Sequence, residues 1–252
     1  MNPVYRQYTE ELHDKFGYLA TWLPNTKLKL GDVGFLKRDR FELITTIDDL
    51  GLHTQSRDIG GAADYQYISS EGASINFDVS GAAPTAVGPI THSAAAKVSV
   101  VFARANAVVF LATGCKTVSI ERHDILGRTI LERFKAGSWD KDYVVITELV
   151  TASSATILIS ATDSAQVDLD SKATVAATGL SLADVNAGFT IRSSSGVATQ
   201  ILAASEITPL FRASAIRRHI FSSPSFDTRS GISTPRNENE DVFGDIDYRD
   251  LE

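Results

Sequence analysis

Apolar residues recur at helical spacing in two stretches of the chain. Near the N-terminus they lie three or four residues apart from Tyr5 to Phe16, and charged residues occupy the opposite face. Pro3 suits the first position of a helix, and Gly17 suits the position just past its end. The second stretch, Asp124 to Lys135, has the same period and is closely followed by a glycine. These patterns predict two helices.

Most of the remaining apolar residues follow the alternation or the short runs that are typical of β-strands. The expected strands are residues 18–23, 28–30, 33–36, 41–45, 75–79, 97–113, 143–151, 154–162, 166–170, 189–193, 199–203 and 209–217. Residues 97–113 form either one very long strand or a hairpin that turns at Arg104–Asn106. The pattern predicts an α+β fold: a large twisted, mainly antiparallel β-sheet with two or three packed helices and a C-terminal tail.

The composition is that of a protein with a substantial apolar core, since 43% of the 252 residues are apolar and 22% are charged. No stretch approaches the roughly 18 uninterrupted apolar residues of a spanning helix, and the polar N-terminus is unlike a signal peptide, so we expect a cytoplasmic protein. The lone Cys115 excludes an intramolecular disulfide and is expected to be a small buried residue. A pI near 5.3 argues against general nucleic-acid binding.

Most of the excess negative charge lies at the C-terminal end. From Ser222 onward the chain holds eight carboxylates against three arginines, a net charge of −5, whereas the whole chain carries −7. The acidic tail, Glu238 to Glu252, follows a Ser/Pro-rich connector and the basic run from Arg212 to His219, to which the tail could be attracted. The tail also contains apolar residues that could dock: Val242, Phe243, Ile246, Tyr248 and Leu251. The tail is therefore a candidate removable latch; the alternative is a disordered solubilising extension.

Sequence motifs for catalysis are absent. The chain has no phosphate-binding glycine loop, no G-x-S-x-G and no H-E-x-x-H. Its five histidines are not spaced with acids or nucleophiles, and His123 beside Asp124 is explained as the start of a helix. We therefore expect a protein that is not an enzyme, with no catalytic residue, cofactor, metal or small-molecule substrate.

Four short segments and the C-terminal peptide carry a family resemblance. The segments are Gly17-Tyr18 with Leu23-Pro24, residues 46–50 (TIDDL), residues 143–148 (YVVITE) and residues 208–217 (TPLFRASAIR). Together they resemble the bacterial gasdermins, pore-forming effectors of programmed cell death in antiphage defence. One departure is that those proteins usually carry a lipidated cysteine near the N-terminus, where this chain has Asn2.

The resemblance implies an autoinhibited, gasdermin-like pore-forming core over residues 1–221. An exposed connector, residues 222–239, would contain the cleavage site of an activating protease, and residues 240–252 would be the acidic autoinhibitory peptide. After cleavage the cytoplasmic protein would form homo-oligomers that insert β-hairpins into the anionic inner membrane. Asp227 would suit an aspartate-specific protease, whereas Arg229 and Arg236 would suit a basic-specific one.

Membrane strands need only about 9 to 11 residues with one lipid-facing side, so they can be hidden in ordinary alternating sequence. The candidates are Phe77, Val100, Phe102, Val109, Ile146, Ile157, Ile159 and Val167. The alternative is that these residues belong to core strands of a stable sandwich. Basic candidates for contact with anionic lipid are Lys27, Lys29, Lys37, Arg38 and Arg40. The alternative is that these basic residues only form the solvent-exposed rim of a hairpin.

A second function fits the same pattern. The chain could be a β-rich, non-enzymatic binding or assembly module, such as a phage or defence-complex component, that recruits a partner through a sheet edge or through the acidic tail.

Overall fold

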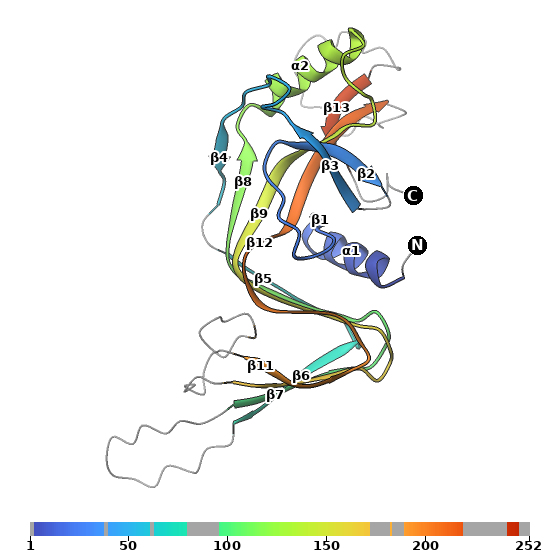
Figure 1. Cartoon of the computed structure of the whole chain (residues 1–252), viewed down its shortest axis with the longest axis vertical. Helices are drawn as coiled ribbons and strands as arrows, with labels where there is room; N and C mark the ends of the chain where they lie inside the picture. The colour runs from blue at the N-terminus through green and yellow to red at the C-terminus, as the bar shows by residue number, and fades with distance from the viewer. Residues whose placement is uncertain are drawn as a thin grey trace, which may run out of the picture. The chain divides into compact units, whose positions relative to one another are not determined.

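A computed structural model describes residues 3–37, 40–60, 63–79, 96–171, 182, 189–218 and 241–246. Over these residues the chain forms two helices and two open, mainly antiparallel sheets (Figure 1), which confirms the predicted α+β class. The elements are α1 (Pro3–Phe16), β1 (Leu19–Ala20), β2 (Asp32–Lys37), β3 (Arg40–Thr46), β4 (Ser56–Asp58), β5 (Ala63–Ile68), β6 (Ala73–Val79), β7 (Ala96–Phe102), β8 (Val108–Ile120), α2 (His123–Lys135), β9 (Val144–Ser160), β10 (Gln166–Asp170), β11 (Thr190–Ser195), β12 (Val197–Arg218) and β13 (Asp241–Asp245).

Strand pairing separates these elements into a large and a small sheet. The large sheet has the order β1-β12-β9-β2-β3, with β13 on β12 and with β4, β5 and β8 joined through β8 to β9. The small sheet has the order β11-β10-β7-β6. The chain also divides into two compact units, which we describe separately. Unit one comprises residues 1–28, 58–118 and 149–211, and unit two comprises residues 29–57, 119–148 and 212–252.

In unit one the central strands of the large sheet, β8 and β9, are buried on both faces. On one face Phe110 and Ile157 pack with Tyr8 of α1, and on the other Val109 packs with Val100 of the small sheet. Successive residues of a strand point to opposite faces, so the continuous apolar run in β8 supplies both contacts. Unit one therefore has three layers, with α1 and the small sheet on opposite faces of the large sheet.

The small sheet has one apolar and one polar face. Val98, Val100, Val167 and Leu169 are buried on the first face. The alternate residues of the same strands are mostly polar, namely Lys97, Ser99, Gln166, Asp168 and Asp170, and the exposed Val101 is an exception. This alternation is that of a half-buried antiparallel sheet.

Hydrogen bonds join the turns that connect the two sheets. Ala103 N donates to Gly72 O at 2.9 Å, Phe102 N donates to Ala165 O at 2.9 Å, and Ala161 N donates to Gly196 O at 2.7 Å. Because β7 belongs to the small sheet and β8 to the large one, residues 97–113 are neither one long strand nor a hairpin. Both alternatives of the sequence prediction were wrong there.

In unit two α2 packs on the large sheet around a core of buried apolar residues. Leu126 and Ile130 of α2 contact Val33 of β2 and Val145 of β9 in one apolar cluster. α2 closely matches the predicted second helix, just as α1 matches the first. β2 and β3 form a hairpin, and β3 lies at one end of the strand order.

Several predicted strand boundaries were wrong. Residues 28–30 form no strand, since Leu28 N donates instead to the Thr208 hydroxyl at 2.9 Å. The strand predicted at residues 18–23 is reduced to β1. Residues 144–160 form one strand, β9, without a break at Ala152–Ser153. Residues 197–218 likewise form the single strand β12.

Candidate functional site

The C-terminal segment is docked in unit two as an added strand. β13 pairs antiparallel with the end of β12, from Ser214 opposite Asp245 to Arg218 opposite Asp241. Just beyond β13, Ile246 N donates to Ala213 O at 2.9 Å. This arrangement is β-strand addition, in which main-chain hydrogen bonds hold a peptide on a sheet edge and side chains give specificity.

Phe243 is the apolar contact of this strand. β13 lies beside α2 (Figure 1). The Phe243 ring lies over Gly127, where an added Cβ would be 3.0 Å from the ring atom Cδ1. The ring centroid is also 5.4 Å from that of His123. Phe243 thereby joins the unit-two core, and the absence of a side chain at Gly127 makes room for it.

A polar cluster around Ser214 completes the docking. The Ser214 hydroxyl donates to Asp245 Oδ1 at 2.8 Å and lies 2.9 Å from His123 Nε2 and 3.2 Å from Thr147 Oγ1. Arg217 Nη1 donates to the Asp245 carbonyl at 2.7 Å. Ser214 is fully buried, so these bonds satisfy a hydroxyl that would otherwise be costly to bury.

The residues Ser214, His123 and Asp245 do not have the geometry of a catalytic triad. In a triad the carboxylate binds the imidazole nitrogen that faces away from the serine. Here Asp245 binds the serine itself, and its Oδ1 lies 4.0 Å from the same Nε2 that faces Ser214. The cluster therefore joins β13 to β12 and α2 rather than forming a nucleophile.

On the polar face of the small sheet, Asp168 accepts a set of converging hydrogen bonds. Gln166 Nε2 donates to Oδ1 at 2.8 Å, and the Ser193 hydroxyl donates to Oδ2 at 2.7 Å. Hydrogen bonds from Gln166, Ser193 and Ser99, together with the charge of Arg192, lower the pKa of Asp168 to about 2. Asp168 is therefore ionised at neutral pH.

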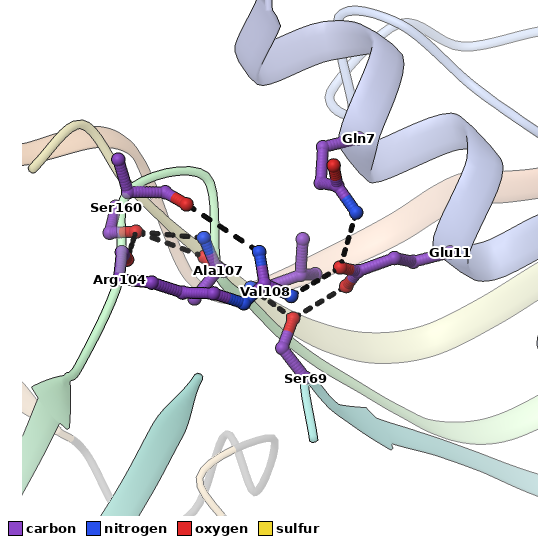
Figure 2. Close-up of polar contacts among 8 residues, drawn as sticks. Gln7, Glu11, Ser69, Arg104, Ala107, Val108 and Ser160 are labelled. Carbon is purple, nitrogen blue, oxygen red and sulfur yellow. Dashed lines mark hydrogen bonds and ion pairs between the residues drawn. The ribbon is translucent and has the colours of Figure 1, made fainter. Parts of the chain in front are cut away.

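In unit one a carboxylate of α1 is tied to the turn between β7 and β8. Figure 2 shows Glu11 between Gln7, Ser69 and Arg104. Glu11 Oε1 lies 2.5 Å from Arg104 Nη2, and its Oε2 accepts from the Ser69 hydroxyl at 2.5 Å. Ser160 fixes the same turn, since its hydroxyl donates to Arg104 O and accepts from Ala107 N, both at 2.8 Å. α1 is thus fastened to the junction of the two sheets.

The candidate membrane residues fall into two groups. Phe77, Val100, Phe102 and Val167 belong to the small sheet, whereas Val109, Ile146, Ile157 and Ile159 belong to β8 and β9 of the large sheet. The side chains of all of these except Phe77, whose side chain lies outside the described part, are buried.

The described basic candidates, Lys27, Lys29, Lys37 and Arg40, are exposed. Lys27 belongs to unit one and lies 3.6 Å from Glu206, whereas Lys29, Lys37 and Arg40 belong to unit two. Lys37 pairs with Glu42 at 3.0 Å. Arg38 lies outside the described residues.

The tail and connector are described only in part. Val242, Phe243 and Ile246 are half-buried. The tail residues Tyr248 and Leu251 and the cleavage candidates Asp227, Arg229 and Arg236 lie outside the described residues.

Sequence reasoning missed Gly127 and Ser214, although a glycine inside an amphipathic helix costs about 1 kcal/mol relative to alanine and could have been noticed.

Among the described residues, no helix is both long and apolar enough to cross a membrane. A scan against protein-family models finds no match for this chain. A search of curated proteins also finds no match.

Proposed function

We propose that this chain is an autoinhibited pore-forming effector. A protease removes the C-terminal segment, the remaining core forms homo-oligomers, and the segments of the small sheet insert as β-hairpins into an anionic membrane. The two-faced small sheet is the observation that carries this proposal. The resemblance of the sequence to bacterial gasdermins extends the proposal to cell death in antiphage defence at the inner membrane.

The two segments that build the small sheet have the composition of membrane hairpins. Residues 73–102 and residues 166–195 each hold thirty residues, enough for two strands of about 9 to 11 residues and a turn. Together they contain only seven charged residues in sixty, about half the frequency of the whole chain. Strands β6, β7 and β10 largely alternate between apolar and polar residues, as membrane strands do between the lipid and the water side.

The apolar face of the small sheet is now buried against β8 and β9. Moving this face into lipid exchanges one apolar environment for another. Exposing it to water on the way costs about 25 cal/mol for each Å². The proposed movement of the small sheet out of the core is therefore favoured only in the presence of a membrane.

The docked tail supports the proposed autoinhibition. A cut after Arg236 would remove β13 with its Phe243 contact and would leave the end of β12 without this partner. It would also change the net charge from −7 to −1. The remaining core would then be repelled far less by anionic lipid.

The experiment is dye release from liposomes of phosphatidylglycerol and phosphatidylethanolamine. We expect leakage from chains ending at Phe226, Arg229 or Arg236. The full-length protein should be silent, and so should a matched chain ending at Asp247, which keeps β13. Silence from every truncated chain, with each shown to be folded by circular dichroism, would overturn the proposal.

One observation favours the second function, a non-enzymatic binding or assembly module. β3 lies at the end of the strand order and exposes Leu43 and Ile44, with 58% and 52% of these residues accessible. A sheet edge with exposed apolar side chains is suited to pairing with another chain. Silence in the liposome experiment, together with loss of partner binding on Leu43→Lys, would support this function.

A further inference from the structure

We propose that the charges of Asp168, Asp170 and Arg192 set the ion selectivity of the pore. This inference rests on the proposed function, and it names the residues that would discriminate between cations and anions. It follows from where these side chains lie on the small sheet.

The three residues form a charge cluster across two neighbouring strands. Arg192 Nη2 of β11 lies 3.6 Å from Asp168 Oδ2 of β10. The Nε of the same guanidinium lies 3.9 Å from Asp170 Oδ1. One arginine is thus placed between two carboxylates.

Strand periodicity places this cluster on the polar face. Val167 and Leu169 alternate with the two carboxylates along β10, and both valine and leucine are fully buried. In a sheet that turns its apolar face to lipid, the opposite face lines the water-filled passage. The cluster that is now in contact with solvent would therefore line the pore.

The described charged side chains on this face are of both signs. Among the described side chains of the small sheet, the charged ones are Lys97, Asp168, Asp170 and Arg192, two of each sign. Lys97 stands directly opposite Asp170 in the β7–β10 register. Changing one charge per subunit alters the net charge of the ring by as many charges as there are subunits, so it should shift the relative permeability of cations and anions.

The hydrogen bonds to Asp168 keep its charge constant. Because Gln166, Ser193 and Ser99 lower the pKa of this carboxyl to about 2, it remains ionised across the ordinary pH range of bilayer recording. Selectivity that depends on Asp168 should therefore be the same at pH 7 and at pH 5.

The test uses the shortest leaking truncation in planar bilayers of phosphatidylglycerol and phosphatidylethanolamine under a KCl gradient. Arg192→Gln should raise the ratio of potassium to chloride permeability, and Asp168→Asn should lower it, each by about twofold or more. The double variant restores the net charge and should return the ratio to that of the unmodified pore. Arg57→Gln on β4 and Asp14→Asn on α1 carry matched charge changes outside the small sheet and should leave the ratio unchanged.

Each outcome decides a different point. If the unmodified truncation gives no conductance, the proposed function fails and the selectivity proposal fails with it. If channels form and neither single variant changes the ratio, the selectivity proposal alone is overturned. A variant that does not conduct is replaced by Asp168→Cys in a Cys115→Ala background. Its current should fall on addition of a water-soluble, membrane-impermeant thiol reagent, and an unchanged current would contradict a lumenal position.

Discussion

The Phe243 ring of β13 lies against Gly127 of α2, at a place where the helix has no side chain. A leucine at position 127 would occupy the space that the ring now fills. We predict that Gly127→Leu displaces β13, even though leucine favours the helix by about 0.5–1 kcal/mol over glycine. Amide hydrogen exchange over residues 241–246 should become at least about tenfold faster.

Glu132→Leu is the matched control, because Glu132 is an exposed residue of the same helix. It should leave exchange in β13 unchanged. Equal exchange in the Gly127→Leu variant and the unmodified protein would show that Phe243 does not hold the strand.

Ser214 connects three elements through one buried hydroxyl. Ser214→Ala leaves Asp245 and His123 without this partner, so we predict a loss of about 1–3 kcal/mol in the free energy of unfolding. Urea denaturation measures the loss. Ser138→Ala removes an exposed hydroxyl that donates to Arg133 O and should cost less than about 0.5 kcal/mol. Similar losses in both variants would contradict a special role for Ser214.

Glu11 fastens α1 to the junction of the two sheets. Glu11→Gln removes the charge that pairs with Arg104, and we predict a destabilisation of about 1–3 kcal/mol. Glu10→Gln makes the same chemical change one residue earlier and should cost less than about 0.5 kcal/mol. Thermal and urea unfolding of the two variants compare these values directly; a Glu11→Gln protein as stable as the Glu10→Gln protein would refute the prediction.

Cys115 reports on the packing of unit one. Desolvation raises the pKa of this buried thiol to about 11, outweighing a hydrogen bond from the Tyr65 backbone. Because the thiolate is the reactive form, we predict labelling by a disulfide reagent at pH 8 at least about a hundredfold slower than in urea. Glu11→Gln should accelerate the labelling of Cys115 in the folded protein, because it weakens the attachment of α1. Equal rates in the folded and unfolded protein would contradict the buried position.

Asp168 should contribute to stability in a pH-dependent way. Its pKa is lowered in the folded protein, so the contribution is present above the ordinary aspartate pKa of 3.8 and is lost as the pH falls toward about 2. We predict that Asp168→Asn lowers the urea midpoint at pH 7 and that the difference shrinks between pH 4 and pH 2. A difference independent of pH would show that the carboxylate charge is not involved.

Both helices and the fold class could be predicted from the sequence because those features are encoded locally. The period from Tyr5 to Phe16 and the glycine after it suffice to define α1. The turn at Arg104–Asn106 was also recognised, but the partners of the strands beside it were not. β7 pairs with β6 and with β10, and its partners on β10 are more than sixty positions away along the chain.

Long-range pairing also explains the wrong strand boundaries. Ala152 and Ser153 have low strand propensity, yet they lie within β9, whose neighbours on both sides supply a ladder that outweighs local preference. The docking of the tail follows the same logic. Apolar residues such as Phe243 indicate from the sequence that the tail can bind to the core. The residues that it contacts, Gly127 and Ser214, come from two distant segments that only the fold brings together.

β12 is a single strand from Val197 to Arg218, with residues in both units. Side chains along a regular strand alternate with a period of two, so one inserted residue reverses the facing of the positions beyond it unless an irregularity restores the register. β12 has such an irregularity at Glu206, whose φ is 54°. An insertion after Phe211 would misplace Ser214 and Ile216 against β13 and α2. The part of β12 beyond Phe211 is therefore expected to have a fixed length, and viable relatives of this chain should vary in loop length while keeping its number of residues constant.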